Sequence, residues 1–165
     1  MTDGWAHFSA DRKYRYLLGR RIGVSDRNLL FIMLNPGTAD ETHNDPTIRR
    51  CIGFAERWKF GVLEVANLFA FRTSHVTELR RTDEPIGSDN DEWISKALTT
   101  ADRVVLAWGN QGAYRGRSRQ VRRMVLKVAQ PYHLGLNKTG EPKHPLYLPA
   151  STAPIPLLLP NILTH

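Results

Sequence analysis

The sequence contains a single cysteine, Cys51, among its 165 residues. A lone cysteine excludes an internal disulfide and a cysteine-based zinc site, and it fits the reducing cytoplasm, where we expect the protein to work. No stretch reaches about 18 consecutive apolar residues, so no membrane span is expected. The first residues, MTDGW, also lack the basic and then apolar pattern of a secretory signal.

Familiar catalytic motifs are missing too. The chain has neither a G-x-G-x-x-G nor a G-K-[ST] motif, and no serine or cysteine nucleophile has a base near it in sequence. Internal repeats and low-complexity tracts are also absent. The length, with 41% hydrophobic and 24% charged residues, is typical of one globular domain. We therefore expect a single domain over residues 1–165, with an extended tail over 149–165.

Acidic residues are missing from one long segment, residues 103–140, which holds eight Lys or Arg. The other fifteen basic and sixteen acidic residues nearly cancel, so the net charge of +7 comes from this segment. Such a segment binds polyanions by releasing counterions, but it is equally typical of a solvated helix on a basic protein. The candidate nucleic-acid contacts are Arg115, Arg119, Arg122, Arg123 and Lys143.

Apolar runs alternate with helical patterns along the chain. The run LLFIML has no polar alternation, which indicates a strand covered on both faces. The predicted strands cover residues 14–20, 29–34, 62–69, 104–108 and 132–136. The predicted helices cover 46–58, 88–101 and 113–129, with a short helical turn after Ser74. This alternation predicts an α/β fold with parallel pairing and right-handed crossovers.

Two helices are marked by local signals. Asp45 is a favourable N-cap and Pro46 suits the first helical position, followed by apolar residues at helical spacing. In the last predicted helix, apolar residues at i, i+3, i+4 and i+7 are expected to face the core. These are Val121, Met124, Val125 and Val128.

Ligands of open parallel sheets bind beyond the carboxyl ends of the strands. That edge would gather residues 35–38, 67–69, 108–110 and 137–145. The loop from Asn35 to Asp45 exceeds the ~2–6 residues usual between a strand and a helix, and long polar loops in this position are often functional. The predicted substrate-binding residues are Pro36, Gly37, Thr38, Asn67, Phe69 and Asn110.

Several of these residues have two interpretations. Gly37 lets the backbone approach a ligand closely, or it serves a simple turn. Asn67 needs several hydrogen-bond partners, which a ligand or neighbouring backbone can supply. Asp40, His43 and Asp45 could bind a metal, but their spacing matches no ligand pattern. We expect neither a metal nor another cofactor.

The chain resembles a bacterial family of small proteins known only as a domain of unknown function. The resemblance covers nearly the whole chain. It rests on Tyr14-Arg15-Tyr16, LFIMLNPGTAD (30–40), DPTIRRCIGFAERW (45–58), VANLFAFR (65–72), VLAWGN (105–110) and KHPLYL (143–148). This membership implies no activity.

More distantly, the order of motifs resembles the uracil-DNA glycosylase superfamily. That resemblance implies a three-layer α/β/α domain with a mainly parallel four-stranded core sheet. In the superfamily, the first motif follows the first core strand and contains Asn-Pro-Gly in the mismatch-specific branch. An Asn ends the second strand, and a His-Pro motif follows the fourth. The matching residues here are Asn35-Pro36-Gly37, Asn67 and His144-Pro145. Leu146-Tyr147-Leu148 departs from the usual Ser or Asn and further Pro, and Phe69 or Phe71 would have to stack on the base.

The resemblance implies that Asn35 positions a water, that His144 stabilises charge on a departing base, and that DNA or a nucleotide is the partner. The first hypothesis is therefore a nucleobase N-glycosylase-like protein. The alternative is a non-catalytic module that binds nucleic acid or a nucleotide through residues 103–140. A third is a hydrolase or transferase for another small molecule that uses Asp40, His43 or Asp45. The sequence indicates no oligomeric state.

Overall fold

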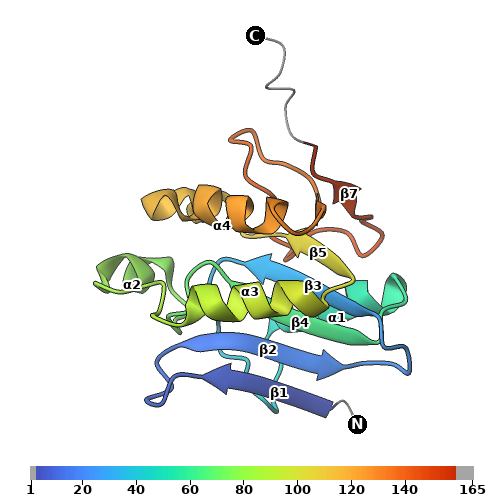
Figure 1. The fold of residues 1–165 in the computed structure, drawn as a ribbon, viewed down its shortest axis with the longest axis horizontal. Coiled ribbons are helices and arrows are strands. Elements are labelled where there is room, and N and C mark those ends of the chain that lie inside the picture. The colour runs from blue at the N-terminus through green and yellow to red at the C-terminus, as the bar shows by residue number, and fades with distance from the viewer. Residues whose placement is uncertain (1–2, 159–165) are drawn as a thin grey trace.

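A single sheet of seven strands runs through residues 3–158, which are the residues that the computed structural model describes (Figure 1). The spatial order is β1-β2-β4-β3-β5-β6-β7. The strands are β1 (Asp3–Phe8), β2 (Arg15–Arg21), β3 (Asn28–Met33), β4 (Val62–Asn67), β5 (Arg103–Leu106), β6 (Pro131–His133) and β7 (Ile155–Pro156). The mixed α/β class expected from the sequence is confirmed.

The sheet has seven strands, whereas five were predicted along the chain and the resemblance implies a core of four. Strand β3 pairs in parallel with β4 and β5, and β5 pairs in parallel with β6. Antiparallel strands extend this parallel part at both edges, with β2 and β1 on one side and β7 on the other. Strands β1 and β7 escaped the sequence analysis because an edge strand needs no buried apolar face. Strand β7 is exposed, and no residue of β1 is fully buried.

Helices cover both faces of the sheet. Helix α1 (Pro46–Arg57) packs on one face, and α2 (Val76–Arg81), α3 (Asn90–Thr100) and α4 (Arg117–Leu126) pack on the other. Strand β3 contributes alternate side chains to the two cores, with Leu30 and Ile32 on the α3 side and Leu29 and Phe31 on the α1 side. This double burial explains its unbroken apolar run.

The start of α1 follows the sequence expectation. The Asp45 carboxylate accepts a hydrogen bond from the backbone N–H of Ile48 at 2.8 Å, and Pro46 opens the helix. This N-cap supplies an acceptor to a backbone N–H that has no partner inside the helix. Because the helix begins beside the end of β3, its first turn stands at the strand-end edge.

The last predicted helix is shorter than expected. A 3-10 turn over Asn110–Gly116 precedes α4, and the backbone breaks at Tyr114 and Arg115. Helix α4 ends at Leu126, so Val128 lies beyond it and is 67% exposed. The expectation that Val128 faces the core is therefore wrong, whereas Val121 and Val125 are buried.

The C-terminal tail is only partly described. Ile155–Pro156 pairs with β6, and residues 159–165 of the expected tail lie outside the described residues. Within residues 3–158, no helix has the length and apolar character needed to cross a membrane.

Candidate functional site

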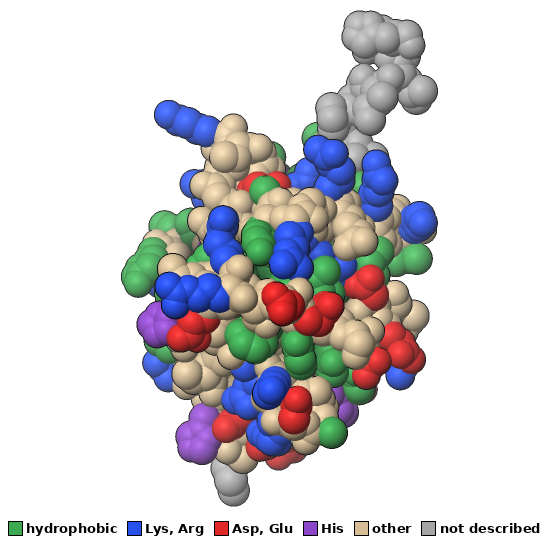
Figure 2. Space-filling view, turned by 90° about the vertical axis from the view of Figure 1, so that its left-hand side faces the viewer, with side chains coloured by type: hydrophobic (Ala, Val, Ile, Leu, Met, Phe, Trp, Pro, Cys, Tyr) green, Lys and Arg blue, Asp and Glu red, His purple; other side chains and the backbone are tan. Residues whose placement is uncertain are grey.

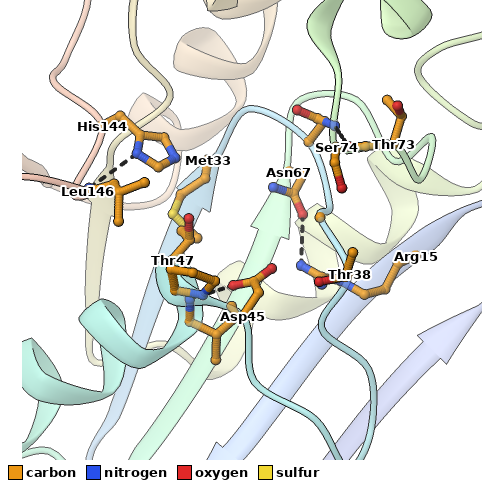
Figure 3. A pocket seen from close by; sticks show the side chains of 14 residues that line it. Arg15, Met33, Thr38, Asp45, Thr47, Asn67, Thr73, Ser74, His144 and Leu146 are labelled. Atoms are coloured by element: carbon orange, nitrogen blue, oxygen red, sulfur yellow. Dashed lines mark hydrogen bonds between the residues drawn. The ribbon is translucent and has the colours of Figure 1, made fainter.

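A pocket of about 270 Å³ opens at the carboxyl ends of β3 and β4, beside the first turn of α1 (Figure 3). Its lining includes Asn35, Asn67 and His144, three residues predicted from the sequence and separated by up to 109 positions. Gly37 and Thr38 also line it, as expected. We call this cavity the strand-end pocket.

Two buried arginines of β2 hold the long loop that forms one wall of the pocket. Arg15 Nη1 donates to the carbonyl of Ala39 at 3.0 Å. Arg20 Nε donates to Asn44 Oδ1 at 2.9 Å and its Nη2 donates to the carbonyl of His43 at 3.1 Å. Each arginine is 2% exposed. The loop is therefore anchored to the sheet by charged hydrogen bonds and is not a free surface segment.

The side chain of Asn35 is fixed by two backbone carbonyls. Its Nδ2 donates to Thr73 O at 2.7 Å and to Pro36 O at 3.1 Å. Carbonyl oxygens only accept hydrogen bonds, so the amide nitrogen must face them. The Oδ1 of Asn35 is consequently the atom left to accept a hydrogen bond in the pocket.

The side chain of Asn67 has the opposite polarity. It is 2% exposed, and its Oδ1 accepts from Arg15 Nη2 at 3.4 Å. A guanidinium only donates, so this contact, although long, sets the orientation of the amide. Figure 3 shows the Nδ2 of Asn67 turned away from Arg15. Asn67 therefore presents a hydrogen-bond donor to the pocket. The partner of its Oδ1 is the side chain of Arg15, whereas the sequence had suggested a ligand or neighbouring backbone.

His144 presents a second donor. Its Nδ1 accepts from the backbone N–H of Leu146 at 3.2 Å, so the proton of the neutral ring lies on Nε2. In Figure 3 this second nitrogen points toward Met33. Burial lowers the pKa of His144 from its usual 6.5, and the charge of Asp45 opposes that change only in part. The ring is thus neutral at neutral pH and can donate from Nε2.

Arg15 and Asp45 give the pocket one charge of each sign. Burial lowers the pKa of Arg15 to about 10, with the charge of Asp45 opposing the change, so the guanidinium stays protonated at neutral pH. The Nε of Arg15 is buried and has no hydrogen-bond partner within residues 3–158. Sequence analysis missed Arg15 as a site residue, although an arginine beside the apolar run Tyr16-Leu17-Leu18 was a usable signal.

Gly37 allows a close approach to Asp45 and not only to a ligand. A Cβ on Gly37 would lie 2.7 Å from Asp45 Oδ2, closer than such contacts occur. The same carboxylate caps α1 through its other oxygen. Gly37 therefore lets the loop pass against the helix cap. It also lines the pocket, so its contact with a ligand stays a prediction.

Three predicted substrate-binding residues do not line the pocket. Phe69 is fully buried in the core beneath α3, in edge contact with Tyr114 at 5.8 Å between ring centroids. It is therefore not available to stack on a ligand. Asn110 is exposed and accepts hydrogen bonds from Asn137 and Thr139, which ties two loops together. Pro36 is buried, and its carbonyl holds Asn35.

The basic residues predicted to grip nucleic acid also lie away from the pocket. None of Arg115, Arg119, Arg122 and Arg123 lines it, and Lys143 donates to Asn137 Oδ1 at 3.0 Å. Arg119 and Arg123 line a separate depression over α4. Figure 2 views the strand-end side, where Lys and Arg prevail in the upper part and mix with acidic side chains below.

A metal or a thiol nucleophile finds no support among the described residues. Asp40 Oδ1 lies 3.2 Å from His43 Nδ1, but His43 is 79% exposed. Backbone N–H groups of Thr42 and His43 hold the pKa of Asp40 well below its usual range. No group of three His, Cys, Asp or Glu within residues 3–158 is placed to bind a metal. Burial raises the pKa of the Cys51 thiol, which leaves it unreactive.

A family model described as a protein of unknown function, DUF1643, matches residues 15–146. The chain belongs to this family. The match begins at Arg15 and ends at Leu146, two residues that both line the strand-end pocket, so the DUF1643 region contains the whole pocket. Comparisons with curated proteins and with solved structures gave no match.

Proposed function

We propose that the strand-end pocket binds a nucleobase and that the protein cleaves the N-glycosidic bond of that base in DNA, a nucleotide or a nucleoside. The observation that carries this proposal is the meeting of Asn35, Asn67 and His144 in one pocket of about 270 Å³. That volume lies just below the ~300–1,000 Å³ of pockets for drug-sized ligands, which suits a single base.

The hydrogen-bonding polarity of the pocket favours a base with carbonyl oxygens. Asn67 Nδ2 and His144 Nε2 are donors, and carbonyl oxygens on a base are the matching acceptors. An exocyclic amino group at either place would put donor against donor, which is costly in a buried site. Apolar surface from Met33, Ile48 and Leu146 lies alongside to contact the faces of the ring.

The same groups suit the chemistry. Breaking the bond between the sugar C1′ and the base nitrogen leaves the electron pair on the base and positive charge on the sugar. His144 donates a hydrogen bond to the base as its negative charge grows. Asn35 Oδ1 accepts from the attacking water and orients it, because an amide cannot remove a proton. Asp45 is the one carboxylate among the described lining residues. Its negative charge stabilises the positive charge on the sugar. The carboxylate can also accept the proton that the attacking water loses.

The resemblance to uracil-DNA glycosylases supports this reading through the placement of its motifs. Asn-Pro-Gly follows β3, Asn67 ends β4, and His144-Pro145 follows β6. A three-layer α/β/α domain built around the parallel strands β4, β3, β5 and β6 is part of the proposal. The superfamily places a wedge after its His-Pro motif, and here Tyr147 is 89% exposed with a φ of 73°. An exposed aromatic beside the pocket suits a wedge between bases.

The direct test is base release. The protein is incubated with oligonucleotides that carry uracil, mismatches or deaminated purines, and with the corresponding nucleosides, and free base is measured by mass spectrometry. We expect release by the wild type and a large loss in Asn35→Ala. Gln111→Ala is the matched control, because it removes an exposed amide that does not line the pocket. Absence of release across these substrates, or equal release by Asn35→Ala, contradicts the proposal.

A further inference from the structure

A groove of about 730 Å³ adjoins the strand-end pocket. The two cavities share Gly37, Thr38, Thr73 and Ser74, so these residues form the rim between them. The groove is lined by three cationic side chains, Arg12, Lys13 and Arg72, and no Asp or Glu is among its described lining residues. We call it the basic groove.

Two of these cations are held against the same aromatic ring. The guanidinium carbon of Arg12 lies 3.8 Å from the Phe8 ring centroid, and that of Arg72 lies 4.6 Å from it. Arg72 Nη1 also donates to the carbonyl of Arg12 at 3.2 Å. Cation–π contacts fix both groups in place, but they bring like charges together. An anion bound in the groove that both side chains line would relieve this repulsion.

The carboxylates near the groove neutralise it only in part. Glu41 pairs with Arg12 at 3.2 Å, with both side chains about half exposed, and such surface pairs are weak. Asp11 accepts hydrogen bonds from the Ser9 hydroxyl and the backbone N–H of Lys13. Within residues 3–158 no carboxylate lies within ion-pair distance of Lys13 or Arg72. Arg72 also adds to the positive potential at the pocket, because its charge helps to lower the pKa of Arg15.

We infer that the basic groove binds the sugar–phosphate backbone of a nucleic acid whose base enters the strand-end pocket. This inference rests on the proposed function. Three cations line one groove and can contact phosphates, and the hydroxyls of Thr38 and Ser74 on the shared rim are donors of the kind that contact phosphate oxygens. Phe71 also lines the groove. Helix α4 has no residue in either cavity, so its arginines are not part of this interface.

Binding is tested by fluorescence anisotropy with a fluorescein-labelled single-stranded oligodeoxynucleotide at several KCl concentrations. Lys13→Ala/Arg72→Gln removes two charges from the groove, and Arg119→Ala/Arg123→Ala removes two charges from α4 as the matched control. Two lost phosphate contacts lower the slope of log K against log salt by about 1.4. We expect at least a tenfold weakening at about 0.1 M salt for the groove variant, and little change for the control.

The single variant Lys13→Ala is included because it is expected to fold normally. The Lys13 side chain is exposed and makes no hydrogen bond within residues 3–158. This variant should lower the slope by about half as much as the double variant. An equal or larger effect of the α4 variant, or no oligonucleotide binding by the wild type, overturns the inference. The inference is also overturned if the protein binds deoxyuridine monophosphate but does not bind the oligonucleotide.

The two proposals fail separately. If oligonucleotide binding depends on Lys13 and Arg72 but no base is released, the groove proposal is supported and the glycosylase proposal is contradicted. Release of base from an oligonucleotide at an unchanged KM in the groove variant leaves the activity standing and removes the groove. Binding by Gln111→Ala at wild-type strength is expected in either case, because Gln111 lines neither the pocket nor the groove.

Discussion

The face of α4 and the strand-end edge are both basic, yet they are built differently. The α4 face draws its arginines from consecutive turns of one helix, and the charge excess is visible in the sequence. The cations of the basic groove come from the turn before β2 and from the segment after β4. The groove adjoins the strand-end pocket. The comparison teaches that a charge excess along the chain is not enough to locate a cavity, whereas the convergence of separate segments identifies a candidate site.

Each region also contains a buried arginine, and the two differ in their partners. Arg117 of α4 donates to the carbonyl of Leu68 at 2.8 Å, to Gln120 and to Asp91. Arg15 of the pocket donates to Ala39 and, at a long 3.4 Å, to Asn67, and its Nε has no partner among the described residues. The three hydrogen bonds of Arg117 are typical of structural support. A buried Nε without a partner among the described residues is shared by Arg15 and by Arg122 of α4, so what distinguishes Arg15 is its position in the lining of the pocket.

The largest expected effect separates the two regions by activity. His144→Ala should lower the rate of base release by about 10²–10³-fold, the usual loss when one donor to a developing anion is removed. Arg123→Ala on α4 should leave the rate within about twofold, because it touches neither cavity. Single-turnover assays on an oligonucleotide measure both. A comparable loss in Arg123→Ala would erase the distinction between the regions.

The buried arginines sharpen the comparison through stability. Arg117→Met should lower the free energy of unfolding by about 2–3 kcal/mol, because it removes charge-assisted hydrogen bonds, one of them to a buried carbonyl. Arg15→Met should cost about 1 kcal/mol or less, since its hydrogen bonds are fewer and longer and its desolvation is unfavourable. It should nevertheless weaken base binding, because the Asn67 amide loses the contact that orients it. Urea denaturation provides the free energies, and the reverse order would contradict this assignment.

The pH dependence of stability and of activity distinguishes His144 from His133. Burial lowers the pKa of both residues. A histidine with a lowered folded pKa stabilises the fold above its unfolded value near 6.5. That stability is lost as pH falls toward the folded pKa, because the unfolded chain binds more protons. Acid should therefore reduce stability through both residues.

Activity should fall in acid because protonation of His144 breaks its Nδ1 contact with Leu146. His133→Gln should thus change the acid limb of a denaturation profile and leave the pH–rate profile in place. A pH–rate profile that shifts in His133→Gln would show that the wrong imidazole has been assigned to the reaction.

The smallest expected effect concerns two glycines. Gly37→Ala places a Cβ 2.7 Å from the Asp45 carboxylate and should weaken ligand binding with a stability loss of about 1 kcal/mol. Gly116→Ala before α4 meets no neighbour, but its φ of 67° should cost about 1 kcal/mol without any effect on ligand binding. Isothermal titration with a free base, beside thermal melts, separates the two. Equal binding by both variants would count against the role given to Gly37.

Much of the scaffold was predictable because its signals are local. The unbroken LLFIML run predicted a strand with two buried faces, and Asp45-Pro46 predicted the start of α1. Asn35, Asn67 and His144 were placed at strand ends by the general rule for parallel sheets. The prediction that Val128 faces the core was wrong because the helical spacing of apolar residues continues past Leu126, where the helix ends. The structure buries Phe69 in the core, and nothing local in the sequence distinguishes a buried ring from one that faces a pocket.

The sequence by itself determined the α/β class, the buried strands, the cap of α1 and the edge where polar residues gather, because each depends on neighbours along the chain. Only the tertiary structure decided that Arg15 orients Asn67, that Gly37 passes against Asp45, and that Arg12 and Arg72 share the ring of Phe8. These contacts join residues far apart in the chain, and their geometry follows from strand register and loop path. Contacts between residues that are distant in the chain produce no repeating pattern that a single sequence would reveal.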